Sequence, residues 1–379
     1  MARLSALSGL VLFLASGAQA FVPSPLARMN TAAKVAPRSK GTMSMVQTDV
    51  MTLTRYMIEN TKQFPDAQDL EVLMSSIQVA CKTISNLVCR AGINDLTGLQ
   101  GGINVQGEEQ KKLDVISNDV LKNALRFTGK LGVVASEEED HPVLVEEAFN
   151  SKYVAVFDPL DGSSNIDAAI STGTIFGIFL ENDACLIDPE GDISEQQMAC
   201  LLNTLQPGSN LVASGYVMYS SSTIFVLTLG NGVNGFTLDP QIGEFVLTHP
   251  NIKIPKRGKI YSFNEANYFD WDPKLQDYVN GLKKKGYSSR YIGSMVGDIH
   301  RTLLYGGVFG YPSDKKNVNG KLRLLYEAAP MGFIMEQAGG KATTGTEPIH
   351  DLQPKSVHQR VPTYLGSPED VDELVAMLK

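Results

Sequence analysis

Apolar and polar residues follow two different periods along the chain, and each period predicts one kind of element. Apolar residues recur at helical spacing over 66–90 and again over 111–127. Short, almost continuous apolar runs predict buried strands at 131–136 and 153–157, and strand-forming residues dominate 210–248. After that region, strands alternate with helices to the end of the chain. The pattern therefore predicts an α/β protein.

Two of the predicted strands end in paired carboxylates. One strand is followed by Glu137 and Glu138, and the other by Asp158 and Asp161 on a turn that contains proline and glycine. Such acids repel one another unless a bound hard cation offsets their charge, although a lone acidic pair is more often a surface feature. If the two strands are neighbours, these carboxylates converge at one sheet edge, where open α/β sheets bind ligands. The candidate ligands of a Mg²⁺ or Mn²⁺ site, which oxygen donors favour over zinc, are Asp114, Glu137, Glu138, Asp158, Asp161 and Glu327.

The turn after Asp161 also has the composition of an anion-binding segment. Gly162, Ser163 and Ser164 offer backbone N–H groups on a glycine turn, which is how many proteins hold phosphate. Metal ligands next to such a turn favour phosphate chemistry. Glu327 lies in the run LRLLYE, at the start of a predicted helix over 322–340.

Composition narrows the possible partners. The chain has 379 residues, long enough for about two domains, and its net charge of −8 argues against nucleic acid as the main partner. Its four cysteines are too few for a disulfide scaffold. Cys81 and Cys89 lie on one predicted helix and are interpreted as small core residues. A boundary near residue 252 would divide the chain into 49–252 and 253–379.

Residues 1–48 belong to a targeting segment and not to the fold. An apolar stretch with a small-residue end near Ala20 is typical of a secretory signal, and it is too short to cross a membrane. The basic, acid-free sequence that follows is typical of a transit peptide. Together they resemble the bipartite presequences of algal secondary plastids, and simple secretion is the alternative. We expect no membrane association of the mature protein.

A set of longer motifs then resembles one family over residues 66–367. The chain resembles the fructose-1,6-bisphosphatases, which belong to the lithium-sensitive, metal-dependent sugar phosphatases. The resemblance rests on the runs KKLDVISND, SEEED, FDPLDGSSNID, GTIFGIF, QPGSNLVASGY, SSRYIGSMVGDIHRTLLYGG, NGKLRLLYE and HQRVP. The plastid type fits best. The resemblance implies alternating α/β/α/β/α layers, a homotetramer, and Mg²⁺-dependent hydrolysis of the 1-phosphate of fructose 1,6-bisphosphate in the Calvin cycle or gluconeogenesis.

The resemblance also implies a role for each matched residue. Glu138 would be the general base, with Asp119 helping to activate water and Arg323 beside the reacting phosphate. The metals would take the six carboxylates named above and the Leu160 carbonyl. The 1-phosphate would bind at Asp161, Gly162, Ser163 and Ser164. The other phosphate would bind Asn264, Tyr291, Tyr311 and Lys321, together with Arg290 from a neighbouring subunit.

Three departures and one insertion qualify this set. Asn267 stands where the family has a phosphate-pocket tyrosine, Leu180 replaces an AMP-binding arginine, and the sequence before the first long helix lacks the nucleotide turn. Inhibition by AMP is therefore not expected. The acidic insertion 181–208 resembles the regulatory loop of plastid enzymes, so Cys185 and Cys200 would form a disulfide that thioredoxin reduces.

Four readings of function compete. Sedoheptulose-1,7-bisphosphatase activity is the close alternative, because that substrate offers a similar phosphorylated end. Inositol phosphatase is disfavoured by Arg290 and Lys321, which suit a second phosphate. A catalytically inactive binding protein is disfavoured because every expected metal carboxylate is present.

Overall fold

The computed structural model describes residues 49–62, 68–103, 109–145, 152–181 and 202–379. Cys185, Cys200 and the targeting segment 1–48 lie outside the described residues. Within them, an eight-stranded sheet has the order β10-β9-β8-β7-β6-β5-β3-β4. Its neighbours are antiparallel except for β5 and β3, which are parallel. The strands are β3 (Leu131–Ser136), β4 (Val143–Leu144), β5 (Tyr153–Asp161), β6 (Thr172–Leu180), β7 (Leu211–Tyr219), β8 (Thr223–Thr228), β9 (Val233–Asp239) and β10 (Glu244–His249).

A second sheet, of five described strands, has the order β12-β11-β13-β17-β15. It mixes parallel pairs, β12 with β11 and β11 with β13, with antiparallel pairs on the other side. These strands are β11 (Ile260–Phe263), β12 (Ser288–Ser289), β13 (Val308–Tyr311), β15 (Lys341–Thr343) and β17 (Thr363–Gly366). Two short ribbons pair β1 (Leu99–Ile103) with β2 (Glu109–Lys111) and β14 (Leu322–Arg323) with β16 (Arg360–Val361).

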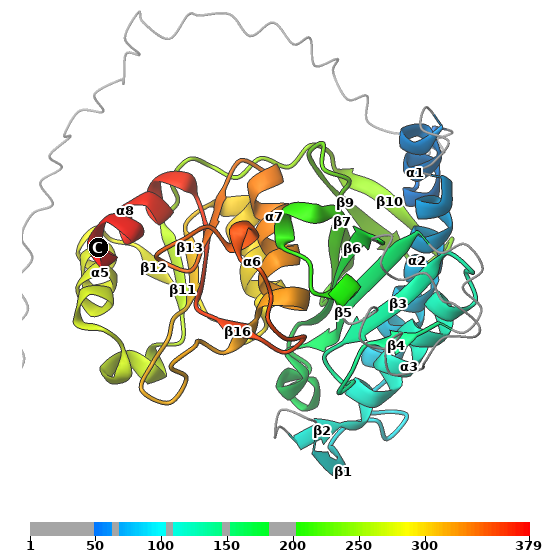
Figure 1. Ribbon diagram of the computed structural model, residues 1–379, viewed down its shortest axis with the longest axis horizontal. Coiled ribbons are helices and arrows are strands. Elements are labelled where there is room, and N and C mark those ends of the chain that lie inside the picture. Colours follow the sequence, from blue (N-terminus) through cyan, green and yellow to red (C-terminus); the bar gives the residue numbers. More distant parts are fainter. Residues whose placement is uncertain (1–48, 63–67, 104–108, 146–151, 182–201) are drawn as a thin grey trace, which may run out of the picture. The chain divides into compact units, whose positions relative to one another are not determined.

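Helices cover both sheets and separate them, as Figure 1 shows. One group packs on the outer face of the large sheet: α1 (Leu53–Thr61), α2 (Gln68–Cys89) and α3 (Lys112–Arg126). Between the sheets lie α6 (Met295–Tyr305) and α7 (Ala329–Gln337). Beyond the small sheet lie α5 (Pro273–Lys284) and α8 (Pro368–Leu378). The result is the alternation of helix and sheet layers that the resemblance implied.

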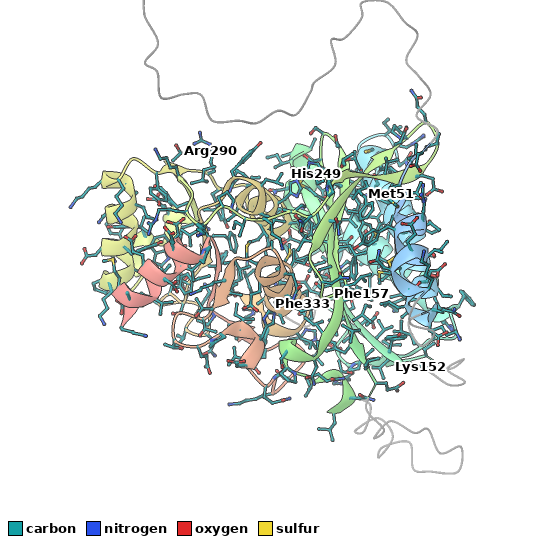
Figure 2. All side chains as sticks on the ribbon, turned by 90° about the horizontal axis from the view of Figure 1, so that it is seen from above. Met51, Lys152, Phe157, His249, Arg290 and Phe333 are labelled. Atoms are coloured by element: carbon teal, nitrogen blue, oxygen red, sulfur yellow. The ribbon has the colours of Figure 1, made fainter. Side chains whose placement is uncertain are left out.

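The apolar pattern of each element matches the layer it faces. In β5, Val154 and Val156 pack toward α6 and α7, whereas Ala155 and Phe157 pack toward α2 and α3, because side chains alternate across a strand. Both faces are covered, so the strand is buried throughout, as its continuous apolar run predicts. Figure 2 marks Lys152 before this strand and Phe157 inside it.

The long apolar helix α2 has the length and composition of a membrane span, but its apolar composition has another explanation. Leu73, Ile77 and Ile84 are buried against the sheet and the neighbouring helices, as expected for a core helix. Cys81 lies on the same buried face. The interpretation of Cys89 as a core residue is wrong, because it lies at the exposed end of the helix.

Two local predictions need correction, and both concern acids. The strand over 153–157 does not stop before Asp158; β5 continues to Asp161. The helix predicted over 322–340 begins later: after β14 the chain forms one π-helical turn, Leu324–Ala328, and α7 starts only at Ala329. Pro330 in the first turn of α7 lacks an N–H group, which suits a helix start.

Candidate active site

A cavity of about 470 Å³ opens where the ends of β5 and β3, the first turn of α6 and the π-helical turn meet. Most of its wall is polar. It gathers residues from segments far apart in the chain: Glu109, Lys111, Asp114, Glu137, Glu138, Asp158, Leu160, Asp161, Gly162, Ser163, Ser164, Asn264, Tyr291, Gly293, Ser294, Met295, Asp298, Phe309, Tyr311, Lys321, Leu322, Arg323 and Glu327.

The acids of β5 reach this cavity through a β-bulge. Asp158 pairs with Ile175 of β6 and Asp161 pairs with Gly173, so β5 has one residue more than β6 in this interval. The Asp158 carboxylate accepts a hydrogen bond from the Leu160 N–H at 2.9 Å, which tightens the bulge. The extra residue breaks the strict alternation of β5, and both carboxylates line one cavity.

The first turn of α6 fixes Asp161. Its carboxylate accepts hydrogen bonds from the Ser294 hydroxyl at 2.6 Å and from the backbone N–H groups of Met295 and Val296 at 3.1 and 2.9 Å. These donors belong to the start of a helix, which favours a negative charge. The close approach also requires glycine at 162, because a Cβ there would lie 2.7 Å from Ser294 Cβ and φ is +73°.

Glu327 enters from the opposite side on the π-helical turn. Its carboxylate accepts a hydrogen bond from the Arg323 N–H at 2.5 Å. The Arg323 guanidinium bridges the acids, with Nη2 at 2.8 Å from Glu137 Oε1 and Nη1 at 3.8 Å from Glu327 Oε2. A π-helical turn often marks a functional site, because it displaces one side chain from the helical register.

The centre of the cavity holds more negative charge than its arginine offsets. Carboxylate oxygens of Asp158, Asp161 and Glu327 lie within 4.8 Å of one another, and all three residues are buried. Burial raises the pKa of Glu327 to about 8, with Arg323 opposing and Glu137 adding to the rise. Burial likewise raises the pKa of Asp161 to about 6, although the Ser294 hydroxyl and the helix N–H groups oppose it. For Asp158, burial followed by the charge of Glu137 raises the pKa well above the usual range.

Asp114 adds a further acid from the first turn of α3. It is 5% exposed, and burial raises its pKa to about 7, with Glu138 and Glu137 contributing. One oxygen accepts the Lys111 N–H at 2.8 Å, whereas Oδ1 is buried and meets no hydrogen-bond partner among the described residues. Crowded buried acids with an unpaired oxygen fit a hard divalent cation, which prefers carboxylate and carbonyl oxygen ligands.

The other end of the cavity is more open and carries neutral hydroxyls and one ammonium group. Tyr311 ends β13, and Lys321 Nζ lies 6.0 Å from the centre of its ring. Tyr291 is 38% exposed, and Asn264 caps the short helix that follows β11. None of these four residues carries a carboxylate. An ammonium group with hydroxyl and amide donors is suited to a phosphate.

The structure does not bring every predicted residue into the cavity. Asp119 is absent from its lining: this side chain is 61% exposed on α3 and lies 4.0 Å from Lys122 Nζ. Arg290 is also absent from the lining; it lies on the surface (Figure 2), and its guanidinium donates to the Ser289 carbonyl at 2.7 Å. Asn267, at the family's tyrosine position, donates to Asp314 at 3.3 Å and does not line the cavity.

Sequence reasoning missed several residues of the site, and Ser294 is the main one. Its position before an amphipathic run predicts an N-cap, and it does accept the Gly297 N–H at 3.3 Å. Nothing in the sequence signals that the same hydroxyl donates to Asp161, 133 positions away. Lys111 was likewise missed; it bonds Asp167 at 2.7 Å at the cavity rim.

Comparison with known proteins adds the family. The model of the fructose-1,6-bisphosphatase N-terminal domain matches residues 51–250, and that of the C-terminal domain matches residues 254–379. The chain belongs to the fructose-1,6-bisphosphatase family. It is 59% identical over 334 residues to the chloroplastic fructose-1,6-bisphosphatase 1 of Arabidopsis thaliana, covering 86% of this chain and 80% of that protein. It is 54% identical over 383 residues to the chloroplastic enzyme of Triticum aestivum, covering 99% and 93%.

Solved structures of the family share the fold. The fructose-1,6-bisphosphatase of Leishmania major in its holo form superposes with a TM-score of 0.81 at 46% identity, covering 87% of this chain and 99% of that one. The apo form of the same enzyme gives a TM-score of 0.77. The predicted layered α/β fold of the sugar phosphatases is thus confirmed.

Proposed function

We propose that the protein hydrolyses the 1-phosphate of fructose 1,6-bisphosphate, with Mg²⁺ as cofactor and Mn²⁺ as a possible substitute, giving fructose 6-phosphate and phosphate. The observation that carries the proposal is the division of one cavity into an acidic end and a cationic, hydroxyl-bearing end. Such a cavity suits a substrate with two phosphates, one of which reacts and one of which only binds. Membership in the fructose-1,6-bisphosphatase family supports it.

The acidic end would hold the metal ions. The proposed ligands are the carboxylates of Asp114, Glu137, Glu138, Asp158, Asp161 and Glu327 and the carbonyl of Leu160. When bound, Mg²⁺ would supply charge that offsets the phosphate oxygens and lowers the pKa of a bound water. Arg323, held at 2.8 Å from Glu137, would offer a fixed positive charge to the reacting phosphate.

Proton transfer from the attacking water falls to the acids at the cavity wall. We assign the base to Glu138, as the family resemblance implies, with Asp114 beside it. Burial raises the pKa of Asp114 to about 7, which suits a group that takes up a proton near neutral pH. Asp119 receives no role, because it lies outside the cavity.

The two phosphates would use different donors. Backbone N–H groups of Gly162, Ser163 and Ser164 would bind the leaving phosphate next to Asp161. At the other end, Asn264, Tyr291, Tyr311 and Lys321 would bind the phosphate that remains. Arg290, exposed on its own subunit, would reach the cavity of a neighbour, which makes a homotetramer part of the proposal.

One assay tests the activity and its alternative. Phosphate release from fructose 1,6-bisphosphate and from sedoheptulose 1,7-bisphosphate is measured on residues 49–379, with Mg²⁺ and after chelation. We expect Mg²⁺-dependent hydrolysis with preference for the fructose substrate, and fructose 6-phosphate as product. Equal rates on both sugars would overturn the substrate assignment, and fructose 1-phosphate as product would reverse the two ends of the cavity.

Regulation and location form a second part of the proposal. Segment 181–208, with Cys185 and Cys200, would be a thioredoxin-reduced loop, and residues 1–48 would direct the protein to a plastid. The chloroplastic relatives support the plastid location. If Cys200→Ser remains activated by reduced thioredoxin, the Cys185–Cys200 pairing is wrong.

The proposal also includes a division of the chain into two domains, 49–252 and 253–379. The limits of the two family models, 51–250 and 254–379, support this division.

A further inference from the structure

The bulge that brings Asp158 and Asp161 into the cavity interrupts the regular pairing of β5 with β6. Between the pairs Asp158–Ile175 and Asp161–Gly173, the β5 backbone departs from the ladder with β6. The Pro159 carbonyl lies in this interval, and the residue is buried. A buried backbone carbonyl needs a hydrogen-bond donor, and where the pairing of two strands is interrupted that partner must come from elsewhere in the protein.

That partner is Thr174 of β6. Its hydroxyl donates to the Pro159 carbonyl at 2.8 Å, and the side chain is completely buried. The Thr174 oxygen lies 2.8 Å from the Tyr219 hydroxyl of β7. Tyr219 belongs to the same buried cluster as Cys81 of α2. Figure 1 shows β5, β6 and β7 next to one another, with α2 behind the sheet.

The direction of every bond in this chain is fixed by its first member. A carbonyl only accepts, so the one proton of the Thr174 hydroxyl points to Pro159. Tyr219 must then donate to Thr174. If the Thr174 proton pointed to Tyr219 instead, the Pro159 carbonyl would lose its bond.

We propose that Thr174 and Tyr219 are positioning residues that hold the β5 bulge and so set the spacing of the Asp158 and Asp161 carboxylates and the Leu160 carbonyl. The inference rests on the proposed function, in which those three groups are metal ligands. Mg²⁺ requires nearly octahedral geometry at about 2.0–2.1 Å, so small shifts of the bulge reduce its binding. Neither residue touches the cavity; both act only through β5.

The same strand provides a matched control. Thr172 lies two residues before Thr174, so both side chains point to the same face of β6. Thr172 is also completely buried, but its hydroxyl meets no hydrogen-bond partner among the described residues. Thr172→Val and Thr174→Val thus remove the same group from the same strand, and only the second removes a contact with the bulge.

The experiment measures metal binding directly and then catalysis. Mg²⁺ and Mn²⁺ are titrated calorimetrically into each variant without substrate. The Mg²⁺ concentration for half-maximal activity and the KM for fructose 1,6-bisphosphate at saturating Mg²⁺ are measured afterwards. We expect Thr174→Val to weaken Mg²⁺ binding about tenfold, the effect of one buried hydrogen bond. The KM at saturating Mg²⁺ should stay unchanged, and Thr172→Val should match the parent protein.

Two further variants separate positioning from a general loss of stability. Thr174→Ser keeps the hydroxyl and should restore Mg²⁺ binding. Tyr219→Phe removes only the second bond and should weaken binding about twofold to threefold. The double variant Thr174→Val with Tyr219→Phe should bind Mg²⁺ no more weakly than Thr174→Val alone, because both act through one contact.

Several results would overturn the inference. They are equal Mg²⁺ binding by Thr174→Val and Thr172→Val, weak binding by Thr174→Ser, or losses in the double variant that add. If Thr174→Val does not fold, unchanged Mg²⁺ binding by Tyr219→Phe overturns it. Mg²⁺ binding is measured without substrate, so this inference can be tested separately from the proposed function. If the protein binds Mg²⁺ but does not hydrolyse the bisphosphate, the proposed function is wrong, and the Mg²⁺ affinities of the variants still test the role of Thr174 and Tyr219.

Discussion

The two ends of the cavity differ in burial and in the sign of their charge. At the acidic end, Asp158 and Glu327 are 2% and 3% exposed, and Asp161 accepts three hydrogen bonds from α6. At the other end, Tyr291 is 38% exposed, and the positive charge comes from the partly exposed Lys321. One end is buried and acidic; the other is more open and carries the positive charge of Lys321.

The difference follows from the free-energy cost of burying charged groups, which is high at the acidic end and low at the other. Buried carboxylates with few counter-charges destabilise the fold, so each needs hydrogen bonds, the Arg323 bridge or a cation. The hydrogen bonds from α6 and the Arg323 bridge hold these carboxylates in place. Half-exposed tyrosines and a lysine cost little to keep, so that end can stay open for a substrate and for a residue of another subunit. The predictions below test this division, beginning with the largest effect.

Neutralising a buried acid should have the largest effect. We expect Asp158→Asn to lower kcat/KM by roughly a thousandfold, since a metal contribution of several kcal/mol depends on that charge. Asp277→Asn changes an exposed acid of α5 and serves as control. Initial rates at saturating Mg²⁺ measure both. An Asp158→Asn enzyme that retains a tenth of the activity would contradict the assignment of the acidic end.

The charged residues of the open end should affect binding more than turnover. Lys321→Ala should raise the KM for the bisphosphate about tenfold to a hundredfold, the range for a charged hydrogen bond, with kcat little changed. Arg290→Ala should do the same.

Mixed oligomers distinguish these two residues. Arg290→Ala subunits combined with Asp158→Asn subunits should regain activity, because a cavity of the first can receive Arg290 from the second. Lys321→Ala subunits combined with Asp158→Asn subunits should not regain the low KM. Recovery in both mixtures, or in neither, would refute the intersubunit role of Arg290.

The acidic end should also make stability and Mg²⁺ binding depend on pH. The folded pKa values of Asp161, Asp114 and Glu327, about 6, 7 and 8, lie above those of the unfolded chain. Proton binding therefore stabilises the metal-free protein below about pH 4, and that stability is lost as the pH rises through these values. Mg²⁺ competes with the protons, so its half-saturating concentration should fall as the pH rises toward about 8.

Thermal unfolding of chelated protein across this pH range measures the first effect, and Mg²⁺ titration of activity measures the second. A melting temperature that rises with pH in the absence of Mg²⁺ would show that these acids are not buried in the metal-free state.

The smallest effect is expected at Asp119. The family resemblance assigns it a part in activating water, whereas the structure places it on the exposed face of α3 beside Lys122. We expect Asp119→Asn to change kcat/KM by less than about twofold, as for most surface substitutions. A loss of a hundredfold would mean that α3 moves to bring this carboxylate into the cavity.

Much of the fold was predictable because its signals are local. Short apolar runs predict the buried strands β3 and β5, and apolar residues at helical spacing predict α2. The family resemblance then supplied the layers and most of the residues that line the cavity, but not Lys111 or Ser294. Asp119, which the resemblance also supplied, does not line the cavity, because a motif match records position in the sequence and not the direction of a side chain.

Other features have no local signal. The bulge in β5 requires Thr174 and Tyr219 of neighbouring strands, and the π-helical turn that carries Glu327 looks like ordinary helix in the sequence. The bond from Ser294 to Asp161 depends on how α6 packs against β5. The bulge and the Ser294–Asp161 bond each depend on a partner more than ten residues away.

By itself, the sequence determined which chemical groups are present and on which elements they lie: paired acids after two strands, glycine and serines after one of them, and a lysine and tyrosines later in the chain. Only the tertiary structure decided that Glu327 meets Asp158 and Asp161, and that their oxygens lie within 4.8 Å of one another. The physical reason is that like charges approach so closely only when packing, hydrogen bonds and a bridging arginine hold them there. Those forces act between segments that are distant in the chain.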